Sequence, residues 1–366
     1  MLNKSGRGAC PRCWESGGKP PFLTCYYLLS FNDRVACFTS SEFLQSRLLP
    51  IPANIHRNVR FSCNCGVFDT IPLKAESIFP TGSILRMALI PTIQIQEIDS
   101  ILQMKALEKL QQDVWGWNDL DTTPLMDFII LKELGGTLIG AFDGERLIGF
   151  AFGFVGYDEG QVVFHSHMLA VHPSYRECGL GLRLKLAQRS AALARGFEHV
   201  TWTFDPLQST NAHLNFRKLG VVANKYKINF YGEESSSALH RYIGTDRLWV
   251  DWFLKSKRVE DRLESRQQKT LDGVERLLQI GSNSLPLCHR VDLRAGKSLL
   301  IEIPANITWL QEKNPESAVA WRNATRAAFV EAFTAGYVVD DFLRTDKNDD
   351  QSGCYLLTPG TVNGLY

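Results

Sequence analysis

The most constraining feature of the chain is a strand-like segment that leads into a glycine-rich helix start. Residues 162–171 read VVFHSHMLAV, and this run of β-branched and aromatic residues predicts a β-strand. A loop with a proline follows and ends in RECGLG at 176–181. We expect a helix from Leu182 to about Arg195, which carries four basic residues and no acidic one. This order limits the chain to folds in which a strand delivers the backbone to a helix N-terminus.

The two glycines of this loop predict an anion site built from the backbone. Glycine lets a ligand approach main-chain amides without obstruction by a side chain. Amides at a helix start lack intrahelical partners and lie at the positive end of the helix dipole, so they bind phosphate groups. A dinucleotide fingerprint is excluded because Leu184 stands where its third glycine belongs. A nucleotide P-loop is excluded because Leu182 and Arg183 replace its Lys and Ser or Thr.

The remaining pattern is R-x-x-G-x-G, preceded by V-x-P and followed by the basic helix. It closely resembles motif A of the GNAT acyltransferase superfamily, which binds the pyrophosphate of acyl-coenzyme A. The resemblance implies that the pantetheine arm pairs with the edge of the preceding strand and that an amide near Leu169 polarises the thioester carbonyl. The residues expected to contact the coenzyme in this stretch are Leu169, Val171, Arg176, Cys178, Gly179, Leu180, Gly181 and Leu182.

The elements before this stretch have the order expected of the same fold. Hydrophobic spacing predicts helices over 95–115 and 124–134, the second ending at two glycines. Two apolar runs, 138–142 and 146–155, flank an Asp-Gly turn and predict a hairpin. We therefore expect an α/β fold with a mixed sheet, the GNAT acyltransferase fold. The expected domains are a poorly ordered N-terminal extension at 1–86, the GNAT domain at 87–256 and a C-terminal α+β extension at 257–366.

A second motif is expected beyond the basic helix. A strand is predicted at 200–204 and a helix at 210–219. The helix resembles motif B of the superfamily, in which an asparagine near the helix start approaches the pantetheine, and Asn211 occupies that place. Asn211 is equally suited to cap the helix, and the two roles are compatible. Strands over 224–231 and 247–254 complete the expected sheet.

The implied chemistry is direct transfer of an acyl group from a thioester to an amine, which needs a base. His165 and His167 lie on one face of the strand by period-two counting, and His165 stands where some superfamily members carry an acid. Either histidine could instead only complete hydrogen bonds on a half-buried strand. Asp205 follows the next strand and is predicted to bind a substrate cation, with an ordinary Asp-Pro turn as the alternative.

The expected proton donor departs from the family pattern. Many GNAT enzymes place a tyrosine five residues after the motif-B asparagine, whereas this chain has Phe216 there. Tyr231 is the preferred substitute and Tyr226 the alternative, while a thiolate can also leave unassisted because a thiol is fairly acidic. The predicted catalytic residues are therefore His165, His167 and Tyr231.

The cysteines are concentrated near the N-terminus, where six of the nine lie within the first 65 residues. Four of them have spacings that could supply zinc ligands: Cys10, Cys13, Cys63 and Cys65. The C-x-C spacing is poor for chelation and the intervening residues lack clear periodicity, so the sequence favours an extension without metal. The three cysteines beyond residue 65, Cys178, Cys288 and Cys354, are scattered, as in a reducing compartment, which predicts a cytoplasmic protein.

The composition excludes other classes. A net charge of +1 and a hydrophobic fraction of 45% describe an ordinary globular protein. This balance argues against a bulk nucleic-acid binder, and no apolar run reaches the roughly 18 residues that span a bilayer. The expected partner is a small-molecule amine, and a homodimer is compatible with the sequence.

The C-terminal third predicts structure rather than chemistry. The expected elements are a charged helix at 258–279, two short strands within 285–303, a helix at 315–335 and a hairpin of 337–343 with 354–357. Asn314 should cap the third of these, with Pro315 at its first position. The elements either pack on the catalytic sheet or form a small α+β domain. Arg322 and Arg326 are suited to bind an acidic substrate or partner.

The sequence thus predicts an acyl-CoA-dependent N-acyltransferase with acetyl-CoA as donor and a small amine or amino-acid-like acceptor. Succinyl-CoA or another acyl-CoA is the alternative donor. Segments reading W-R-x-A-T-R-x-A-F and T-F-D-P-L resemble those of a bacterial GNAT subgroup with a C-terminal extension. One competitor is a GNAT-fold module that binds coenzyme A without catalysis, which Phe216 keeps open. The other is a zinc-dependent interaction protein whose activity resides in residues 1–65.

Overall fold

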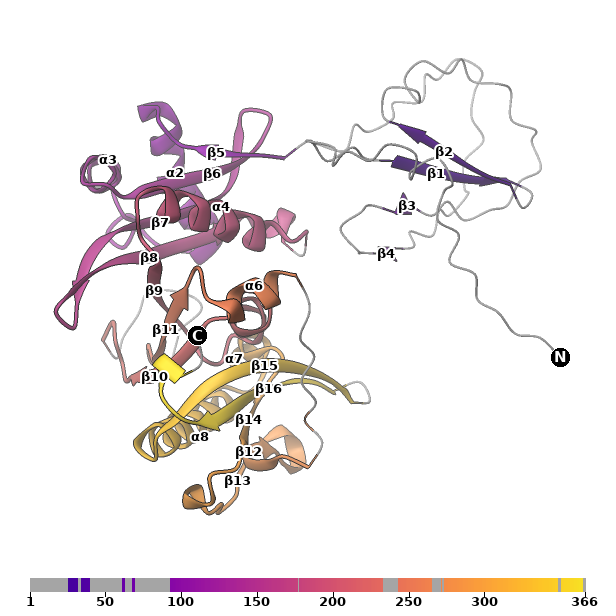
Figure 1. Ribbon diagram of the computed structural model, residues 1–366, viewed down its shortest axis with the longest axis vertical. Helices are drawn as coiled ribbons and strands as arrows, with labels where there is room; N and C mark the ends of the chain where they lie inside the picture. The colour runs from indigo at the N-terminus through magenta and orange to yellow at the C-terminus, as the bar shows by residue number, and fades with distance from the viewer. Residues whose placement is uncertain are drawn as a thin grey trace. The chain divides into compact units, whose positions relative to one another are not determined.

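The computed structural model describes residues 93–364, with gaps at 177, 233–242, 265–270, 272 and 348–349, and four short strands nearer the N-terminus (Figure 1). The chain divides into two compact units, Met1–Met87 and Ala88–Tyr366. The described strands of the first unit form two antiparallel pairs: β1 (Tyr26–Phe31) with β2 (Arg34–Thr39), and β3 (Phe61–Ser62) with β4 (Phe68–Asp69). The four cysteines considered as zinc ligands lie outside the described residues, so the zinc hypothesis stays a prediction.

The second unit is built on one mixed sheet (Figure 1). Its strands are β5 (Gln94–Glu97), β6 (Thr137–Asp143), β7 (Arg146–Asp158), β8 (Gln161–Val171), β9 (His199–Phe204), β10 (Val222–Lys227), β11 (Arg247–Phe253), β12 (Glu275–Ile280), β13 (Pro286–Cys288), β14 (Leu299–Pro304), β15 (Tyr337–Lys347) and β16 (Asp350–Pro359). In the described part of the chain these twelve strands follow the order β13-β12-β14-β16-β15-β10-β11-β9-β8-β7-β6-β5. Two neighbouring pairs, β8 with β9 and β12 with β14, run parallel.

The first helix starts later than its hydrophobic spacing predicts. α2 (Ile101–Trp115) begins at Ser100, whose side chain accepts a hydrogen bond from the Gln103 amide, while the Gln103 side chain bonds back to the cap. This capping box fixes the helix start, so the prediction of a helix from residue 95 is wrong for the preceding residues, which form β5. α3 (Leu125–Glu133) agrees with its prediction and ends before Gly135, which has a φ of 90°.

The two faces of β6, β7 and β8 are covered by different helices. α2 and α3 pack on one face, where Met104, Leu107 and Phe128 meet aromatic residues of β7. On the opposite face lies α4 (Leu180–Ala194), whose Leu180 and Leu184 are buried against the same strands. The sheet therefore has helical layers on both sides in this half, and β8 carries side chains into each of them.

The hairpins that frame β7 are tighter than the sequence suggested. Asp143 pairs with Arg146 across a two-residue turn, as the Asp-Gly signal predicts. The loop expected at 157–161 is a second two-residue turn, because Asp158 pairs with Gln161. Both central residues adopt positive φ values, 48° for Glu159 and 84° for Gly160, and only the second is a glycine, for which this conformation is easy. These turns place β8 in the sheet between β7 and β9.

The helix expected at 210–219 has two parts. α5 (Ser209–Ala212) continues into a π-helix, η3 (His213–Leu219), and Gly220 ends it with a φ of 75°. π-helical turns are rare and often accompany functional sites. The strand predicted at 224–231 ends at Lys227, because Asn229 takes a φ of 46° and turns the chain. The residues after Lys227 therefore form a turn and not a strand.

The C-terminal third continues the same sheet. β15 pairs antiparallel with β10 through Ala223 and Val339, so the elements pack on the sheet and do not form a separate domain. Of the charged helix predicted at 258–279, the described residues form α6 (Lys257–Leu263), and residues 275–280 form β12, where Leu277 and Leu278 are buried. The remaining helices are α7 (Ile307–Lys313) and α8 (Pro315–Thr334).

α8 is the helix that the sequence predicted best. Asn314 caps it by accepting a hydrogen bond from the Ser317 amide at 3.1 Å, with Pro315 at the first position. Its apolar face carries Trp321 and Phe329, both fully buried. One hydrophobic cluster joins this face to residues of α4, η3 and strands from both halves of the sheet. The C-terminal third is therefore packed into the core of the sheet.

Candidate functional site

The parallel strands β8 and β9 diverge at the middle of the sheet. Their last paired position is His165 with Thr201. From residue 166 to 171, β8 keeps β7 on one edge, and its other edge has no strand partner among the described residues. Backbone groups along that edge are therefore open to an extended ligand. Leu169 and Val171, both predicted to contact the coenzyme, lie in this stretch.

A β-bulge at His167 sets the side chains of this edge. Met168 and Ser166 pair with consecutive residues of β7, so His167 is the extra residue. The bulge shifts the alternation of side chains along β8. Leu169 and Val171 consequently face α4 and pack near its first turn, while Met168 faces α2. The bulge thus brings the open strand edge and the start of α4 together.

α4 begins beside this edge without a side-chain cap. Gly179 is the N-cap residue, with a φ of 70°. The first intrahelical bond runs from the Arg183 amide to the Gly179 carbonyl at 3.2 Å, so the amides of residues 180–182 have no partner within the helix. A Cβ atom at Gly179 would meet nothing within 4 Å, whereas at Gly181 it would lie 3.6 Å from Leu214. Gly179 therefore borders open space, and a diphosphate site needs such room beside unpaired amides.

The cations around this loop are held by the protein itself. Arg176 donates from Nε to the Val171 carbonyl at 3.4 Å, which fastens the loop to the end of β8. Two arginines of α4 and its C-cap residue bind other parts of the chain: Arg183 donates to the Ile93 carbonyl at 2.8 Å, Arg189 to the Leu254 carbonyl at 3.1 Å, and the C-cap Arg195 pairs with Glu97 at 3.2 Å. These arginines thus anchor α4 to neighbouring parts of the chain. Cys178 is a free, exposed thiol.

Asn211 lies in the first turn of α5 with an exposed side chain. The N-cap residue of α5 is Gln208 and no side chain caps this helix, so the capping role considered for Asn211 is wrong. The following π-helix lies against α4, with Leu214 near Gly181. Asn211 is therefore exposed on the helix that neighbours the proposed diphosphate loop.

The predicted catalytic histidines lie together on the face of β8 opposite α4. The ring centroids of His165 and His167 are 6.3 Å apart, and both rings contact Phe154. His165 places Nδ1 3.0 Å from the Thr201 hydroxyl, and its ring centroid lies 5.2 Å from that of Trp249. This face is therefore an aromatic surface in which two imidazoles are embedded.

Tyr231 reaches the same face from the turn after β10. Its hydroxyl lies 3.5 Å from the Thr203 hydroxyl of β9. Thr203 pairs with Trp249 of β11, and side chains of directly paired residues share a face of the sheet. Because Trp249 contacts His165, the three predicted catalytic residues are brought to one surface. Half of the Tyr231 side chain is exposed there.

The pKa values of both histidines are lowered from their ordinary value. Burial lowers the pKa of His165 from 6.5 to about 4, and the positive charges of His167 and Lys185 add to this effect. Desolvation by surrounding side chains also lowers the pKa of His167, although His167 is exposed to solvent. A neutral imidazole has a free lone pair and can accept a proton.

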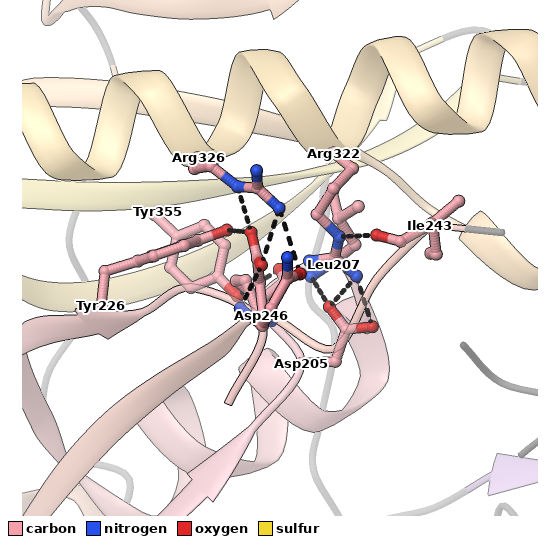
Figure 2. A network of polar contacts seen from close by, with 10 residues as sticks. Asp205, Leu207, Tyr226, Ile243, Asp246, Arg322, Arg326 and Tyr355 are labelled. Carbon is pink, nitrogen blue, oxygen red and sulfur yellow. Dashed lines mark hydrogen bonds and ion pairs between the residues drawn. The ribbon is translucent and has the colours of Figure 1, made fainter. Parts of the chain in front are cut away.

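Asp205 belongs to a buried ion pair and not to this surface (Figure 2). Its carboxylate is 1% exposed and accepts hydrogen bonds from the Arg322 guanidinium at 2.9 and 2.8 Å and from the Leu207 amide at 2.9 Å. Arg322 of α8 compensates the charge, so the structure speaks against the predicted binding of a substrate cation by Asp205. The Arg322 guanidinium, predicted to bind an acidic substrate or partner, is instead paired with Asp205 of the same chain.

The alternative proton donors lie away from the histidines. Tyr226 pairs with Leu248, one position from Trp249, so it points to the opposite face of the sheet. Its hydroxyl donates to Asp246 at 2.8 Å and its ring stacks on Phe329. Burial raises the pKa of Tyr226 well above 10. Phe216 is fully buried. Tyr231 is thus the tyrosine that remains near the histidines.

Lys185 is a feature that the sequence analysis missed. Its side chain is buried on the α4 side of the point where β8 and β9 diverge. The Lys185 Nζ atom lies 2.8 Å from the Ser166 hydroxyl, 3.2 Å from the side-chain oxygen Oε1 of Gln188 and 3.6 Å from the centroid of the Trp202 ring. Ser166 and Trp202 are the first residues beyond the last paired position of the two strands. A polar residue next to Leu184 on the buried stripe of α4 was the available signal.

The described residues contain no group of three or more His, Cys, Asp or Glu side chains placed to hold a metal ion. Nor does any helix in the described part of the chain combine the length and apolar character needed to cross a membrane.

Comparison with known proteins agrees with this geometry. Residues 102–221 match the model of the acetyltransferase (GNAT) family. No curated protein matches the chain. Similar solved structures include the ribosomal-protein-S18-alanine N-acetyltransferase from Escherichia coli, with 15% identity and a TM-score of 0.36 over 45% of this chain and 95% of that one. Another is the PaiA N-acetyltransferase from Thermoplasma acidophilum in complex with coenzyme A, with 16% identity and a TM-score of 0.31 over 44% of this chain and 99% of that one.

A third similar structure is an aminoglycoside 6'-acetyltransferase type Ii, with 19% identity and a TM-score of 0.37 over 45% of this chain and 99% of that one. All three structures are less than 25% identical to this chain, with TM-scores below 0.5, so the similarity with most bearing on activity is the family match at residues 102–221. The matched segment holds both helices before β6, the bulged strand, the uncapped start of α4 and the π-helix. Residues 102–221 are therefore the part of the chain that matches the acetyltransferase (GNAT) family, and the match does not extend into the C-terminal third.

Proposed function

We propose that this protein transfers an acyl group from acyl-coenzyme A, with acetyl-CoA as the donor, to the amine of a small molecule. The observation that carries the proposal is the unpaired edge of β8 next to the uncapped start of α4, within the segment that matches the family. An extended pantetheine needs a strand edge, and a diphosphate needs unpaired amides. Both lie within one continuous stretch, 166–182.

The residues present fit such a donor. The amides of Gly179, Leu180, Gly181 and Leu182 would hold the diphosphate, with Cys178 and Arg176 completing the loop. The backbone of Leu169 and Val171 would pair with the pantetheine, and the exposed Asn211 would approach it from α5. The lack of a Cβ atom at Gly179, where nothing lies within 4 Å, leaves room for the phosphates.

The acceptor would approach the face that carries the histidines and Tyr231. Its amine nitrogen attacks the thioester carbonyl carbon, the C–S bond breaks and an amide forms. His165 would take the amine proton, directly or through a water, since its lowered pKa keeps it neutral at pH 7. His167 could serve in its place. Tyr231 would protonate the departing thiolate through its exposed hydroxyl.

Cations near this surface favour an acceptor that also bears a negative charge, such as an amino acid. Lys227 is exposed, and its ammonium lies 5.9 Å from the centroid of the Trp249 ring. Arg247 pairs with Lys227 across β10 and β11 and lies 5.0 Å from the centroid of the Tyr231 ring. An acceptor carboxylate bound there would leave its amine near the histidines, over the aromatic surface.

A coenzyme A-binding module without catalysis is the second candidate, because Phe216 stands where many family members have a tyrosine and is fully buried. Release of free thiol from acetyl-CoA or succinyl-CoA, measured over a panel of amines and amino acids, separates the two functions. Turnover with any amine supports the enzyme, and the faster donor identifies the acyl group. Coenzyme A binding without turnover on the whole panel supports the module.

Donor binding has its own test. Gly181→Asp would place a carboxylate beside the amides of α4, where it would bond to them and repel the diphosphate. We expect the Kd for coenzyme A, measured by titration calorimetry, to rise by about 30-fold or more. Asn314→Asp adds a carboxylate at the start of α8 in the same way and should leave this Kd unchanged. An unaltered Kd in Gly181→Asp would rule out the diphosphate site.

A further inference from the structure

α8, which lies outside the segment that matches the family, reaches the acceptor side of the site through two arginines one helical turn apart (Figure 2). Arg322 binds Asp205 at the end of β9 and also donates from Nε to the Ile243 carbonyl at 3.0 Å. Arg326 binds Asp246, the residue immediately before β11, with Nε and a terminal nitrogen at 2.8 and 2.9 Å. The two-pronged Arg326 contact fixes both carboxylate oxygens of Asp246.

Asp246 in turn fixes the turn that carries Tyr231. Its carboxylate is fully buried and also accepts hydrogen bonds from the Asn229 amide at 2.9 Å and from the Tyr226 hydroxyl at 2.8 Å. The neighbouring Thr245 accepts from the Tyr231 amide at 3.0 Å and donates to the Gly232 carbonyl at 2.5 Å. Asp246 and Thr245 thus connect the residues just before β11 to the turn at 229–232, and Arg326 connects α8 to Asp246.

The turn at 229–232 closes through a backbone hydrogen bond from the Gly232 amide to the Asn229 carbonyl at 2.9 Å, but it also contains a strained residue. Asn229 has a φ of 46°, a conformation that costs energy for a residue other than glycine. Gly244 approaches so closely that a Cβ there would lie 2.6 Å from the Asn229 side-chain oxygen. Such a conformation persists only where surrounding contacts over-determine it. Arg326 supplies part of that support from a helix that is almost 100 residues away in sequence, since it lies 97 positions from Asn229.

We propose that Arg326 is a positioning residue for the acceptor side of the site, and that α8 sets the place of Tyr231 through Asp246 and the turn at 229–232. This inference rests on the proposed acyl transfer only for its kinetic consequence. The C-terminal third then has a function in the reaction, because it holds the turn whose Phe230 and Tyr231 border the aromatic surface. Phe230 contacts both Tyr231 and Trp249.

The test compares Arg326→Gln and Arg326→Lys with Arg276→Gln. Arg276 makes an ion pair with Glu302 in the C-terminal strands at a similar exposure, 27% against 29% for Arg326, so its loss controls for a general loss of stability. Amide hydrogen exchange of residues 228–232 is measured in the full chain, which needs no substrate. We expect exchange to quicken by about tenfold in Arg326→Gln, by less in Arg326→Lys, and not at all in Arg276→Gln.

Steady-state kinetics supply the second readout. The KM for the amine should rise about tenfold in Arg326→Gln, with partial recovery in Arg326→Lys, while the Kd for coenzyme A stays within about twofold. Unchanged exchange at 228–232, or equal losses of amine and coenzyme affinity, would overturn the inference. Absence of turnover in the unmodified protein would overturn the proposed function instead, and hydrogen exchange would still decide whether Arg326 holds the turn.

Discussion

The two faces of β8, at the point where it leaves β9, carry nitrogen bases that differ in their exposure to solvent. On the face toward α4, Lys185 is 2% exposed and lies between Ser166 and the Trp202 ring. On the other face, His165 and His167 border solvent among aromatic side chains. Burial lowers the pKa on both faces, well below 10.5 for Lys185 and to about 4 for His165. The physical cause is the same desolvation.

Access separates the two cases. A lowered pKa makes a group a candidate for catalysis only if a substrate can reach it. His167 is exposed and His165 partly so, whereas Lys185 is enclosed by α4, β8 and β9. We therefore assign the histidines to proton transfer and Lys185 to packing at the point of divergence. The predictions below test this division, from the largest effect to the smallest.

We expect the largest loss of activity from a substitution on the face of β8 that carries His165 and His167, called the open face because it borders solvent. His165→Gln keeps a side chain able to bond to Thr201 but removes the imidazole, so kcat should fall by about 100-fold or more. His199→Gln is the matched control, since His199 lies on the neighbouring strand and pairs with Asp251 at 2.9 Å. It should change kcat by less than about twofold. If both variants retain kcat while His167→Gln loses it, His167 is the base, and if all three retain it, the open face holds no base.

The pH profile tests whether the histidines are as desolvated as the structure indicates. An imidazole with a pKa of 6.5 would lose about tenfold in its neutral fraction between pH 7.5 and 5.5. Because the pKa of His165 is about 4, its neutral fraction is nearly constant over that range. We therefore expect kcat at saturating substrates to change by less than about twofold between these pH values. A tenfold fall that disappears in His165→Gln would show an ordinary, solvated histidine.

The open face illustrates what the sequence could predict. The strand at 162–171 and the glycine loop are local patterns, so the sequence located β8 and the start of α4 within two residues. Period-two counting placed both histidines on one face. The bulge at His167 kept them there because it lies after His165 and shifts only the residues that follow.

The opposite face of β8, where Lys185 is enclosed, and the turn at 229–232 could not be predicted in this way. Asp205 and Arg322 are separated by 117 positions, and no periodicity of either segment indicates their pairing. Lys185 entered the sequence analysis only as one of the four basic residues of the predicted helix, although its side chain is buried in the structure. Tertiary packing overrides residue type in both cases. The site is thus predictable where one segment builds it and not where the C-terminal third contributes.

The enclosed cation should affect stability rather than activity. Lys185→Met keeps the length of the side chain and removes a buried amine that has no carboxylate among its described hydrogen-bond partners. Replacing a buried charge by a packed apolar group is often neutral or favourable, so we expect an increase of about 1 kcal/mol in unfolding free energy at pH 7. Lys255→Met, at an exposed lysine, should change stability by less than about 0.5 kcal/mol.

The sign of the pH dependence distinguishes this account from simple repacking. The pKa of Lys185 is lowered in the folded protein, so the unfolded chain binds more protons between that lowered pKa and about 10.4. Stability of the unmodified protein therefore rises with pH across this window, and the advantage of Lys185→Met should shrink as pH rises. Denaturant titrations at several pH values measure this trend. A gain in stability that is independent of pH would mean that Lys185 is not desolvated. A higher Kd for coenzyme A in Lys185→Met would mean that Lys185 also supports the unpaired edge of β8, where β8 and β9 diverge.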